Sequence, residues 1–226
     1  MNNNVLISIE GNIGSGKTTL LTELRRMYAD NLQIIFLREP VDEWEKIKDC
    51  DGITMLQKFY LDQEKYSFSF QMMAFITRLS LLKKAMLDNK NAIIITERSL
   101  FTDKWVFAKM LYDKKYIEDV NYQIYLKLFN EFSNDFPLQH MIYVKTNPEI
   151  CRERIHARSR TGEDVISLEY LQDCNKYHDD FVNNFKCSLH LLDGNINIYE
   201  EKKTLNDWLS FIDTIISKAT LDNSIL

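Results

Sequence analysis

The chain reads Gly11-Asn12-Ile13-Gly14-Ser15-Gly16-Lys17-Thr18 near its start, and this stretch matches the phosphate-loop pattern G-x-x-x-x-G-K-[ST] at every fixed position. Three of the six glycines in the chain fall within it. Glycines let main-chain N–H groups turn inward around phosphate oxygens. Lys17 would neutralise the outer phosphates, and the Thr18 hydroxyl would bind Mg²⁺. The predicted phosphate cradle comprises Gly11, Asn12, Ile13, Gly14, Ser15, Gly16, Lys17, Thr18 and the following Thr19.

This loop lies in the expected context, between an apolar strand at Val5–Glu10 and a helix at Lys17–Tyr28. A Rossmann dinucleotide loop does not fit, because its third glycine position holds Thr19. The phosphate loop alone does not separate kinase, ATPase and GTPase. Because the sequence contains no N-K-x-D guanine motif, a regulatory GTPase is the weaker of these readings.

The rest of the chain alternates between strand and helix patterns, which indicates an α/β fold with a parallel sheet covered on both faces. We find no internal repeat or linker and therefore predict a single domain over residues 1–226. The further predicted strands are Gln33–Leu37, Ala92–Thr96, Met141–Val144 and Leu189–Leu192. The further predicted helices are Ile53–Leu87 in two pieces meeting near Lys65-Tyr66, Asp103–Tyr112, Tyr122–Phe132, Pro148–Ala157, Leu168–Phe185 and Glu201–Lys218.

Composition excludes several classes of protein. The 226 residues are 45% hydrophobic and 27% charged, which is typical of a globular domain. A net charge of −5 argues against a nucleic-acid polymer as partner. The four cysteines and four histidines are dispersed without zinc or disulfide spacing. With no targeting signal and no stretch long enough for a membrane span, we expect a cytoplasmic protein without a membrane partner.

Two acidic positions and an arginine follow predicted strands at the carboxyl edge of the sheet, where ligands of open α/β folds bind. Glu39 follows the second strand, and Glu97-Arg98 follows the third. Near a phosphate loop, one carboxylate can accept a hydroxyl proton, another can position Mg²⁺, and the arginine can stabilise the transferring charge. The alternative is that these residues only end a strand and begin a helix.

The sequence resembles the deoxynucleoside kinase family over almost its whole length. The motifs that carry the resemblance are Gly11–Thr18, Glu39-Pro40-Val41 with Trp44, the run Ser67–Gln71 continuing to Arg78, Glu97-Arg98-Ser99, and Arg158–Tyr170. The resemblance implies the P-loop nucleoside/nucleotide kinase fold: a five-stranded parallel sheet flanked by helices, with an arginine-bearing lid at about residues 158–166. It also implies ATP and Mg²⁺ as cofactors and transfer of the γ-phosphoryl group to the 5′-hydroxyl of a deoxynucleoside in nucleotide salvage.

Matched position by position, the resemblance implies that Glu39 is the general base, with Arg98 beside it at the hydroxyl and Lys17 at the phosphates. Glu97 and Thr18 would anchor the metal. Gln71 would pair with the base through an amide that offers both a donor and an acceptor. The full implied substrate set is Glu39, Trp44, Tyr60, Gln71, Arg78, Arg98, Asp103, Phe107 and Glu163. Tyr60 on a helix surface and Phe107 in the core are the plain structural alternatives.

Four arginines fall within nine residues, at positions 152, 154, 158 and 160. The resemblance makes Arg158 and Arg160 lid residues over the ATP phosphates and Arg154 a partner of the ATP base. A solvated basic helix end is the alternative. Gly162 stands where close relatives often carry a second acid, which puts the flexibility of the lid in question.

Arg78 and Asp103 bear on the choice of base. Charged residues occupy these positions in deoxycytidine and deoxyguanosine kinases, whereas thymidine-accepting relatives carry uncharged ones. An Asp carboxylate only accepts hydrogen bonds, so it favours an amino group over the carbonyl of thymine. We therefore expect deoxycytidine, deoxyadenosine and deoxyguanosine to be favoured over thymidine. The alternative is a salt bridge that supports helix packing.

Residues 68–87 are apolar nearly all round, and the resemblance suggests a homodimer packed through helices here, although the core of a monomer explains the same pattern. The competing enzyme is a deoxynucleoside monophosphate kinase of the thymidylate kinase type, which also has a phosphate loop and an Arg-Glu-Pro strand end. Here Val41-Asp42-Glu43 follows, adding acid where a monophosphate would favour basic or small residues. A non-enzymatic nucleotide switch leaves Gln71 and Glu163 unexplained.

Overall fold

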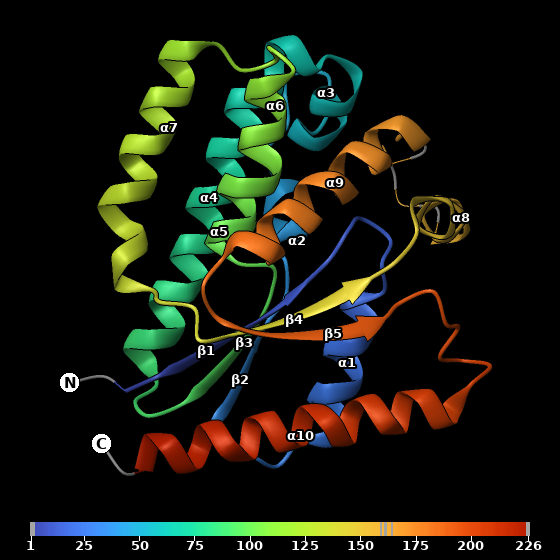
Figure 1. Cartoon of the computed structure of the whole chain (residues 1–226). Helices are drawn as coiled ribbons and strands as arrows, with labels where there is room; N and C mark the ends of the chain where they lie inside the picture. Colours follow the sequence, from blue (N-terminus) through green and yellow to red (C-terminus); the bar gives the residue numbers. More distant parts are fainter. Residues whose placement is uncertain (1–2, 159, 161, 164, 225–226) are drawn as a thin grey trace.

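Five parallel strands form one sheet in the order β2-β3-β1-β4-β5 (Figure 1). The computed structural model describes residues 3–158, 160, 162–163 and 165–224. The strands are β1 (Val5–Glu10), β2 (Ile34–Leu37), β3 (Ile93–Glu97), β4 (His140–Lys145) and β5 (Ser188–Asp193). This confirms the predicted five-stranded parallel sheet; the extent of a single domain over residues 1–226 stays a prediction.

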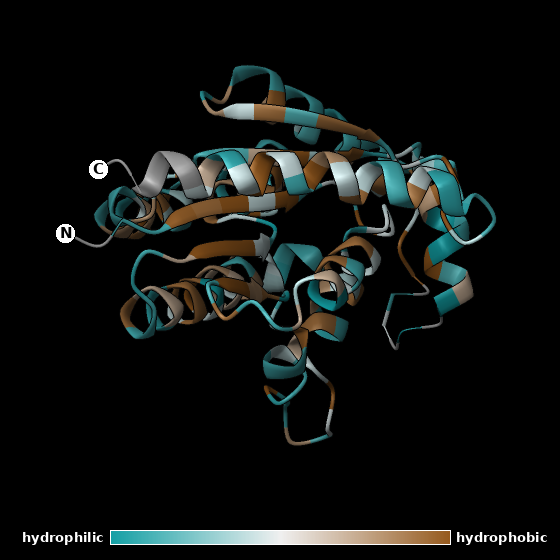
Figure 2. Ribbon diagram, turned by 90° about the horizontal axis from the view of Figure 1, so that it is seen from below, coloured by the Kyte–Doolittle hydropathy of each residue, from teal (hydrophilic) through white to brown (hydrophobic). Residues whose placement is uncertain are grey.

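The central strands are apolar because both of their faces are covered. On β1, Leu6 packs into one core cluster, whereas Ile7 and Ile9 pack into the other. Helices α1 (Lys17–Met27) and α10 (Lys202–Ser224) contribute to the second cluster. Figure 2 shows the hydrophobic colour along the strands of the sheet. Each buried aliphatic side chain contributes roughly 1.5–3 kcal/mol, so both clusters stabilise the fold.

The opposite face of the sheet carries α4 (Gln63–Asp88), α7 (Asp119–Phe132) and α9 (Leu168–Asn184), which supply most of the first cluster (Figure 1). The shorter elements are α2 (Val41–Trp44), α3 (Met55–Leu61), α5 (Leu100–Thr102), the π-helical turn η1 (Asp103–Ala108), α6 (Lys109–Asp113), the 3₁₀ turn η2 (Ser133–Asp135) and α8 (Pro148–Arg158). Two consecutive elements, η1 and α6, run where one helix at Asp103–Tyr112 was predicted, and α5 directly precedes them.

One local expectation was wrong, and two short elements were not predicted. The break between α3 and α4 lies at Asp62, not near Lys65-Tyr66, because the Asp62 side chain accepts the Lys65 N–H and starts the second helix. The short helix α2 and the π turn η1 were not predicted. The helix α4 is apolar nearly all round, and two of its apolar residues, Ile76 and Leu87, are 54% and 70% exposed.

None of the helices in the described part of the chain is long and apolar enough to cross a membrane. The four cysteines, all within the described residues, form no disulfide.

Candidate active site

A cavity of about 790 Å³ opens at the carboxyl edge of the sheet. It runs from the loop after β1, past the ends of β2 and β3, to the helices α3 and α4. Of the residues predicted from sequence for the site, Gly11 and Asn12 do not line it. Those that do are Ile13, Gly14, Ser15, Gly16, Lys17, Thr18, Thr19, Glu39, Trp44, Tyr60, Gln71, Arg78, Glu97, Arg98, Asp103, Phe107, Arg154, Arg158, Arg160 and Glu163.

The phosphate loop passes tightly between β1 and α1, and its geometry requires glycine. A Cβ on Gly14 would lie 2.5 Å from the carbonyl oxygen of Cys151 in α8, and Gly14 has φ 79°. Gly16 has φ 100° and precedes the first turn of α1, so main-chain N–H groups without helical partners face the cavity. A loop of this kind at a helix N-terminus binds anions such as phosphate.

Lys17 is the first residue of α1 and is only 4% exposed. Its Nζ donates to the main-chain oxygen of Asn12 at 2.6 Å. Burial lowers the pKa of Lys17 to about 7, and nearby Arg98 adds to this effect, although Glu97 and Glu39 oppose it. A phosphate in this loop would supply the negative charge that favours the protonated ammonium group.

The residues predicted to anchor the metal, Thr18 and Glu97, lie side by side. The Thr18 hydroxyl donates to Glu97 Oε1 at 2.6 Å, and both residues line the cavity. Hydroxyl and carboxylate oxygens are hard ligands of the kind that Mg²⁺ takes. No group of three His, Cys, Asp or Glu side chains in the described ranges forms a metal site made of protein alone. Thr18 and Glu97 thus offer two oxygens that fit the predicted magnesium anchor.

Glu39, directly after β2, is held by two arginines. Arg98 Nη1 lies 2.7 Å and 2.8 Å from its two carboxylate oxygens, and Arg78 Nη2 donates to Oε1 at 3.1 Å. Burial by itself would raise the pKa of Glu39, but Arg98, Arg78 and Lys17 lower it to about 2. Glu39 is therefore ionised at neutral pH. Arg98 adopts φ 62°, a left-handed conformation that costs a non-glycine residue energy.

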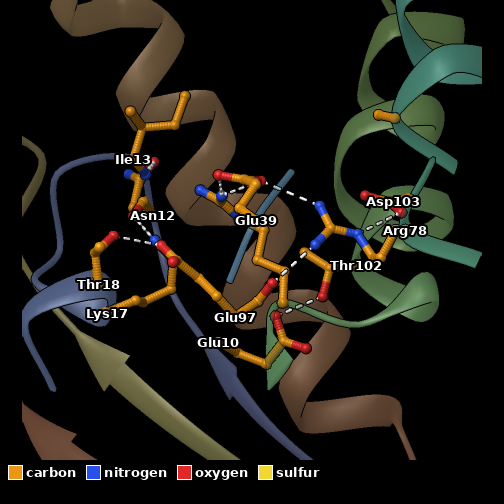
Figure 3. A network of polar contacts seen from close by, with 12 residues as sticks. Glu10, Asn12, Ile13, Lys17, Thr18, Glu39, Arg78, Glu97, Thr102 and Asp103 are labelled. Atoms are coloured by element: carbon orange, nitrogen blue, oxygen red, sulfur yellow. Dashed lines mark hydrogen bonds and ion pairs between the residues drawn. The ribbon is translucent and has the colours of Figure 1, made fainter. Parts of the chain in front are cut away.

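Arg78 on α4 connects Glu39 to Asp103, the first residue of η1 (Figure 3). Its Nε donates to Asp103 Oδ2 at 2.9 Å, and its Nη1 donates to the main-chain oxygen of Glu97 at 2.8 Å. Burial raises the pKa of Asp103 to about 6, an effect that the salt bridge with Arg78 opposes. The salt bridge anticipated as an alternative thus exists, and it also faces the cavity.

The end of the cavity farthest from the phosphate loop is aromatic. Gln71 is 2% exposed, and its Oε1 has no hydrogen-bond partner among the described residues. The Trp44 indole N–H donates to Thr77 Oγ1 at 2.9 Å, which fixes the orientation of the ring. Sequence reasoning missed Leu56, Phe59, Phe70, Ala74 and Tyr170, which also line this part. Their apolar pattern alone does not distinguish a pocket wall from the core.

The lid residues converge on Glu163. Arg158 Nε donates to Glu163 Oε2 at 2.8 Å, and Arg160 Nη1 donates to Oε1 at 3.1 Å. Gly162 has φ 86°, and a Cβ there would lie 2.9 Å from Gln57 Cγ, so Gly162 packs against α3. Of the predicted lid 158–166, Ser159, Thr161 and Asp164 lie outside the described residues.

Arg154 of α8 contacts a second loop that sequence reasoning missed. Its guanidinium donates to the main-chain oxygens of Gly194 at 2.8 Å and Ile196 at 3.3 Å. Residues 194–199, between β5 and α10, line the cavity beside the phosphate loop. The position of this loop in the sequence could have identified it. It follows the last strand, so it lies at the same carboxyl edge of the sheet as Glu39 and Glu97.

Comparison with known proteins agrees with this geometry. The deoxynucleoside kinase family profile matches residues 7–217. The probable deoxycytidine kinase of fowlpox virus (strain NVSL) is 34% identical over 223 residues, which cover 94% of this chain and 88% of that protein. Human deoxycytidine kinase is 30% identical over 196 residues, covering 78% and 74%. The mitochondrial deoxyguanosine kinase of Xenopus laevis is 29% identical over 194 residues, covering 78% and 72%.

A phosphate loop, an arginine-held carboxylate and a buried amide thus share one cavity, in a chain matched by a family profile over almost its full length. The chain belongs to the deoxynucleoside kinase family.

Proposed function

We propose that this enzyme transfers the γ-phosphoryl group of ATP to the 5′-hydroxyl of a deoxynucleoside in nucleotide salvage, favouring deoxycytidine, deoxyadenosine and deoxyguanosine over thymidine. The observation that carries the proposal is the position of Glu39. Its carboxylate lies near Lys17 of the phosphate loop and accepts a hydrogen bond from Arg78 of α4, the helix that also carries Gln71. A hydroxyl that reaches Glu39 from the aromatic side would face the phosphates.

In this proposal the donor triphosphate occupies the phosphate loop, where Lys17 and the N-terminus of α1 stabilise its charge. Arg158 and Arg160 exchange their bonds with Glu163 for phosphate oxygens when both ligands are present. The donor base lies near Arg154, whose N–H groups hold the Gly194–Ile196 main chain, so that the plane of the guanidinium is left for stacking.

Magnesium fits the pair of oxygens offered by Thr18 and Glu97. When bound there, it neutralises charge on the transferring phosphoryl group.

Glu39 orients the 5′-hydroxyl by accepting its proton in a hydrogen bond, and it takes the proton as the hydroxyl oxygen attacks. A pKa of about 2 makes Glu39 a weak base in the ligand-free state. Its main contribution is therefore placement and charge, and transfer of the proton follows as bond formation acidifies the hydroxyl. Arg98 holds both carboxylate oxygens and thereby fixes the direction of approach.

The nucleoside lies at the aromatic end of the cavity. Trp44 and Phe107 flank the base, Gln71 pairs with its edge, and Tyr60 with Glu163 holds the 3′-hydroxyl. The carboxylate of Asp103, oriented by Arg78, favours bases that present an amino group. A wrong base would leave buried polar groups without hydrogen-bond partners, and this costs binding free energy. Arg78 and Asp103 can therefore discriminate strongly between bases.

One assay tests the proposal. Purified enzyme with ATP and Mg²⁺ is given each of the four deoxynucleosides and, separately, each of the four deoxynucleoside monophosphates. We expect nucleoside monophosphates as products, with thymidine the poorest acceptor. Conversion of monophosphates to diphosphates as the faster reaction would favour the thymidylate kinase type instead.

We also infer that the enzyme is a homodimer packed through α4 and α7. The exposed apolar side chains Ile76, Val120 and Ile124 lie on these two helices, which contact each other. Light scattering on the variant Ile124→Glu should give the mass of a monomer. The control Leu32→Glu, which changes an exposed leucine in the loop between α1 and β2, should leave the wild-type mass. A monomeric wild type would contradict the inference.

A further inference from the structure

Asn12 belongs to the phosphate loop but faces away from the cavity. It is 1% exposed, and its Nδ2 donates to the main-chain oxygen of Leu171 in the first turn of α9 at 2.8 Å. Its Oδ1 accepts the Ile13 N–H at 2.8 Å. The side-chain amide therefore connects α9 to the phosphate loop, and both its nitrogen and its oxygen form hydrogen bonds.

The main chain of the same residue holds the catalytic lysine. The Asn12 carbonyl accepts from Lys17 Nζ at 2.6 Å and from the Ser15 N–H at 3.2 Å. A displacement of the α9 end at Leu171 would therefore move the group that positions Lys17. Figure 3 shows Asn12 next to Ile13 and Lys17 in this network.

Packing reinforces the connection. Ile13 of the loop forms a separate apolar cluster with Cys151 and Ile155 of α8, Ile166 before α9, and Leu171. The helix α8 ends at Arg158 and α9 begins at Leu168, so the two helices that flank the predicted lid both pack on the phosphate loop.

The first turn of α9 also reaches the nucleoside end of the cavity. Tyr170, next to Leu171, meets Tyr60 edge to face with ring centroids 6.2 Å apart, and both rings line the cavity. One helical turn thus contacts the phosphate loop through Leu171 and the nucleoside end of the cavity through Tyr170.

We propose that Asn12 is a positioning residue that couples the two substrate sites: it fixes α9 to the phosphate loop, so that binding of the donor triphosphate orders the turn that closes on the nucleoside. The physical basis is shared ordering. A ligand that rigidifies the loop and α9 leaves less entropy for the second ligand to lose, which makes the two bind with positive cooperativity. The inference rests on the proposed pair of substrates.

The experiment measures the Kd of the non-hydrolysable ATP analogue adenylyl imidodiphosphate by calorimetry, with and without saturating deoxycytidine. In wild type we expect deoxycytidine to lower this Kd by about fivefold or more. In Asn12→Ala the ratio should fall to within about twofold of one, kcat should be reduced, and the KM for ATP at saturating deoxycytidine should rise because the coupling is lost. The matched control, Asn175→Ala, removes an amide that bonds Asp179 within the same helix and does not line the cavity; it should keep the wild-type ratio.

Asn12→Ser is the second variant. A serine hydroxyl is too short to reach the Leu171 carbonyl, but unlike alanine it keeps a polar group at this buried position. Amide hydrogen exchange tests the proposal on the wild-type protein. Binding of the ATP analogue alone should slow the exchange of the main-chain amides of residues 171–178 at least about tenfold. An unchanged ratio in a folded Asn12 variant, or unchanged exchange in wild type, would overturn the proposal. If the proposed function itself were wrong, the result would be different: wild type would neither bind nor phosphorylate deoxycytidine.

Discussion

Arg98 Nη1 lies within 2.8 Å of both carboxylate oxygens of Glu39, so one nitrogen of the guanidinium holds the whole carboxylate. The Nε of Arg98 is buried without a hydrogen-bond partner among the described residues. Arg98 thus fixes Glu39 while keeping a donor available close to it. A hydroxyl oxygen that carries increasing negative charge is the kind of group such a donor stabilises.

Glu39→Gln should keep the fold and the binding of ATP but lower kcat by roughly 10²–10⁴, because an amide cannot accept the hydroxyl proton. Steady-state kinetics with deoxycytidine checks this, with thermal unfolding to show that the variant is folded. Glu45→Gln, an exposed carboxylate at the end of α2 outside the cavity lining, is the control. If Glu39→Gln kept more than a tenth of the wild-type kcat, Glu39 would not be the group that accepts the hydroxyl proton.

Binding of ATP should take up a proton above neutral pH. The pKa of Lys17 is lowered to about 7, so the free enzyme holds it largely neutral at about pH 8.5. The triphosphate favours the charged ammonium group and raises the pKa, so that close to one proton is bound with ATP at this pH and little at about pH 6. Calorimetry in buffers of different ionisation enthalpy measures the uptake.

The control for this measurement is Lys17→Arg, which keeps the charge but does not titrate in this range. Uptake should vanish in this variant. Equal uptake by wild type and Lys17→Arg would assign the proton to another group.

Arg78 and Asp103 should behave as one unit. Their side chains are 7% and 2% exposed, and a buried charge that loses its partner costs about 3–5 kcal/mol. Arg78→Met also removes a contact of Glu39, so each single variant should lose stability or activity with every base. The double variant Arg78→Met/Asp103→Ala removes both charges, including the carboxylate that repels a thymine carbonyl.

In this double variant the kcat/KM ratio of thymidine to deoxycytidine should rise at least about tenfold, or about 1.4 kcal/mol. Gln71 still pairs with the base, because its amide offers a donor and an acceptor. Efficient turnover of thymidine by wild type, or an unchanged ratio in a folded double variant, would leave the pair a purely structural role.

The triphosphate of the best substrate should inhibit competitively with ATP. Such a molecule carries both the base that the aromatic end accepts and the triphosphate that the loop holds, and one continuous cavity lined by Lys17 and Gln71 contains both places. Two sets of contacts then form for one loss of translational freedom. Inhibition constants for all four deoxynucleoside triphosphates test this. Equal inhibition by accepted and rejected bases would contradict a molecule that spans both places.

The strands and the charged part of the site follow from sequence because their signals are local. Buried parallel strands are short apolar runs, and charged residues at or just beyond their carboxyl ends, such as Glu97 and Glu39, fall at the ligand-binding edge. Phe59 and Phe70 were not predictable, since an aromatic pattern is the same in a core and in a pocket wall. The π turn at Asp103–Ala108 also has no periodic signature of its own, because it inserts into a segment of helical pattern.

The left-handed backbone at Arg98 has a consequence for laboratory evolution. A non-glycine residue in this conformation costs about 1–3 kcal/mol, so the backbone at this position would tolerate glycine more easily than the arginine it carries. A glycine at this position would, however, leave the buried Glu39 carboxylate without its nearest cation, and that loss of about 3–5 kcal/mol exceeds the strain that glycine relieves. Libraries selected for thermal tolerance and libraries selected for turnover should therefore both retain arginine at this one codon.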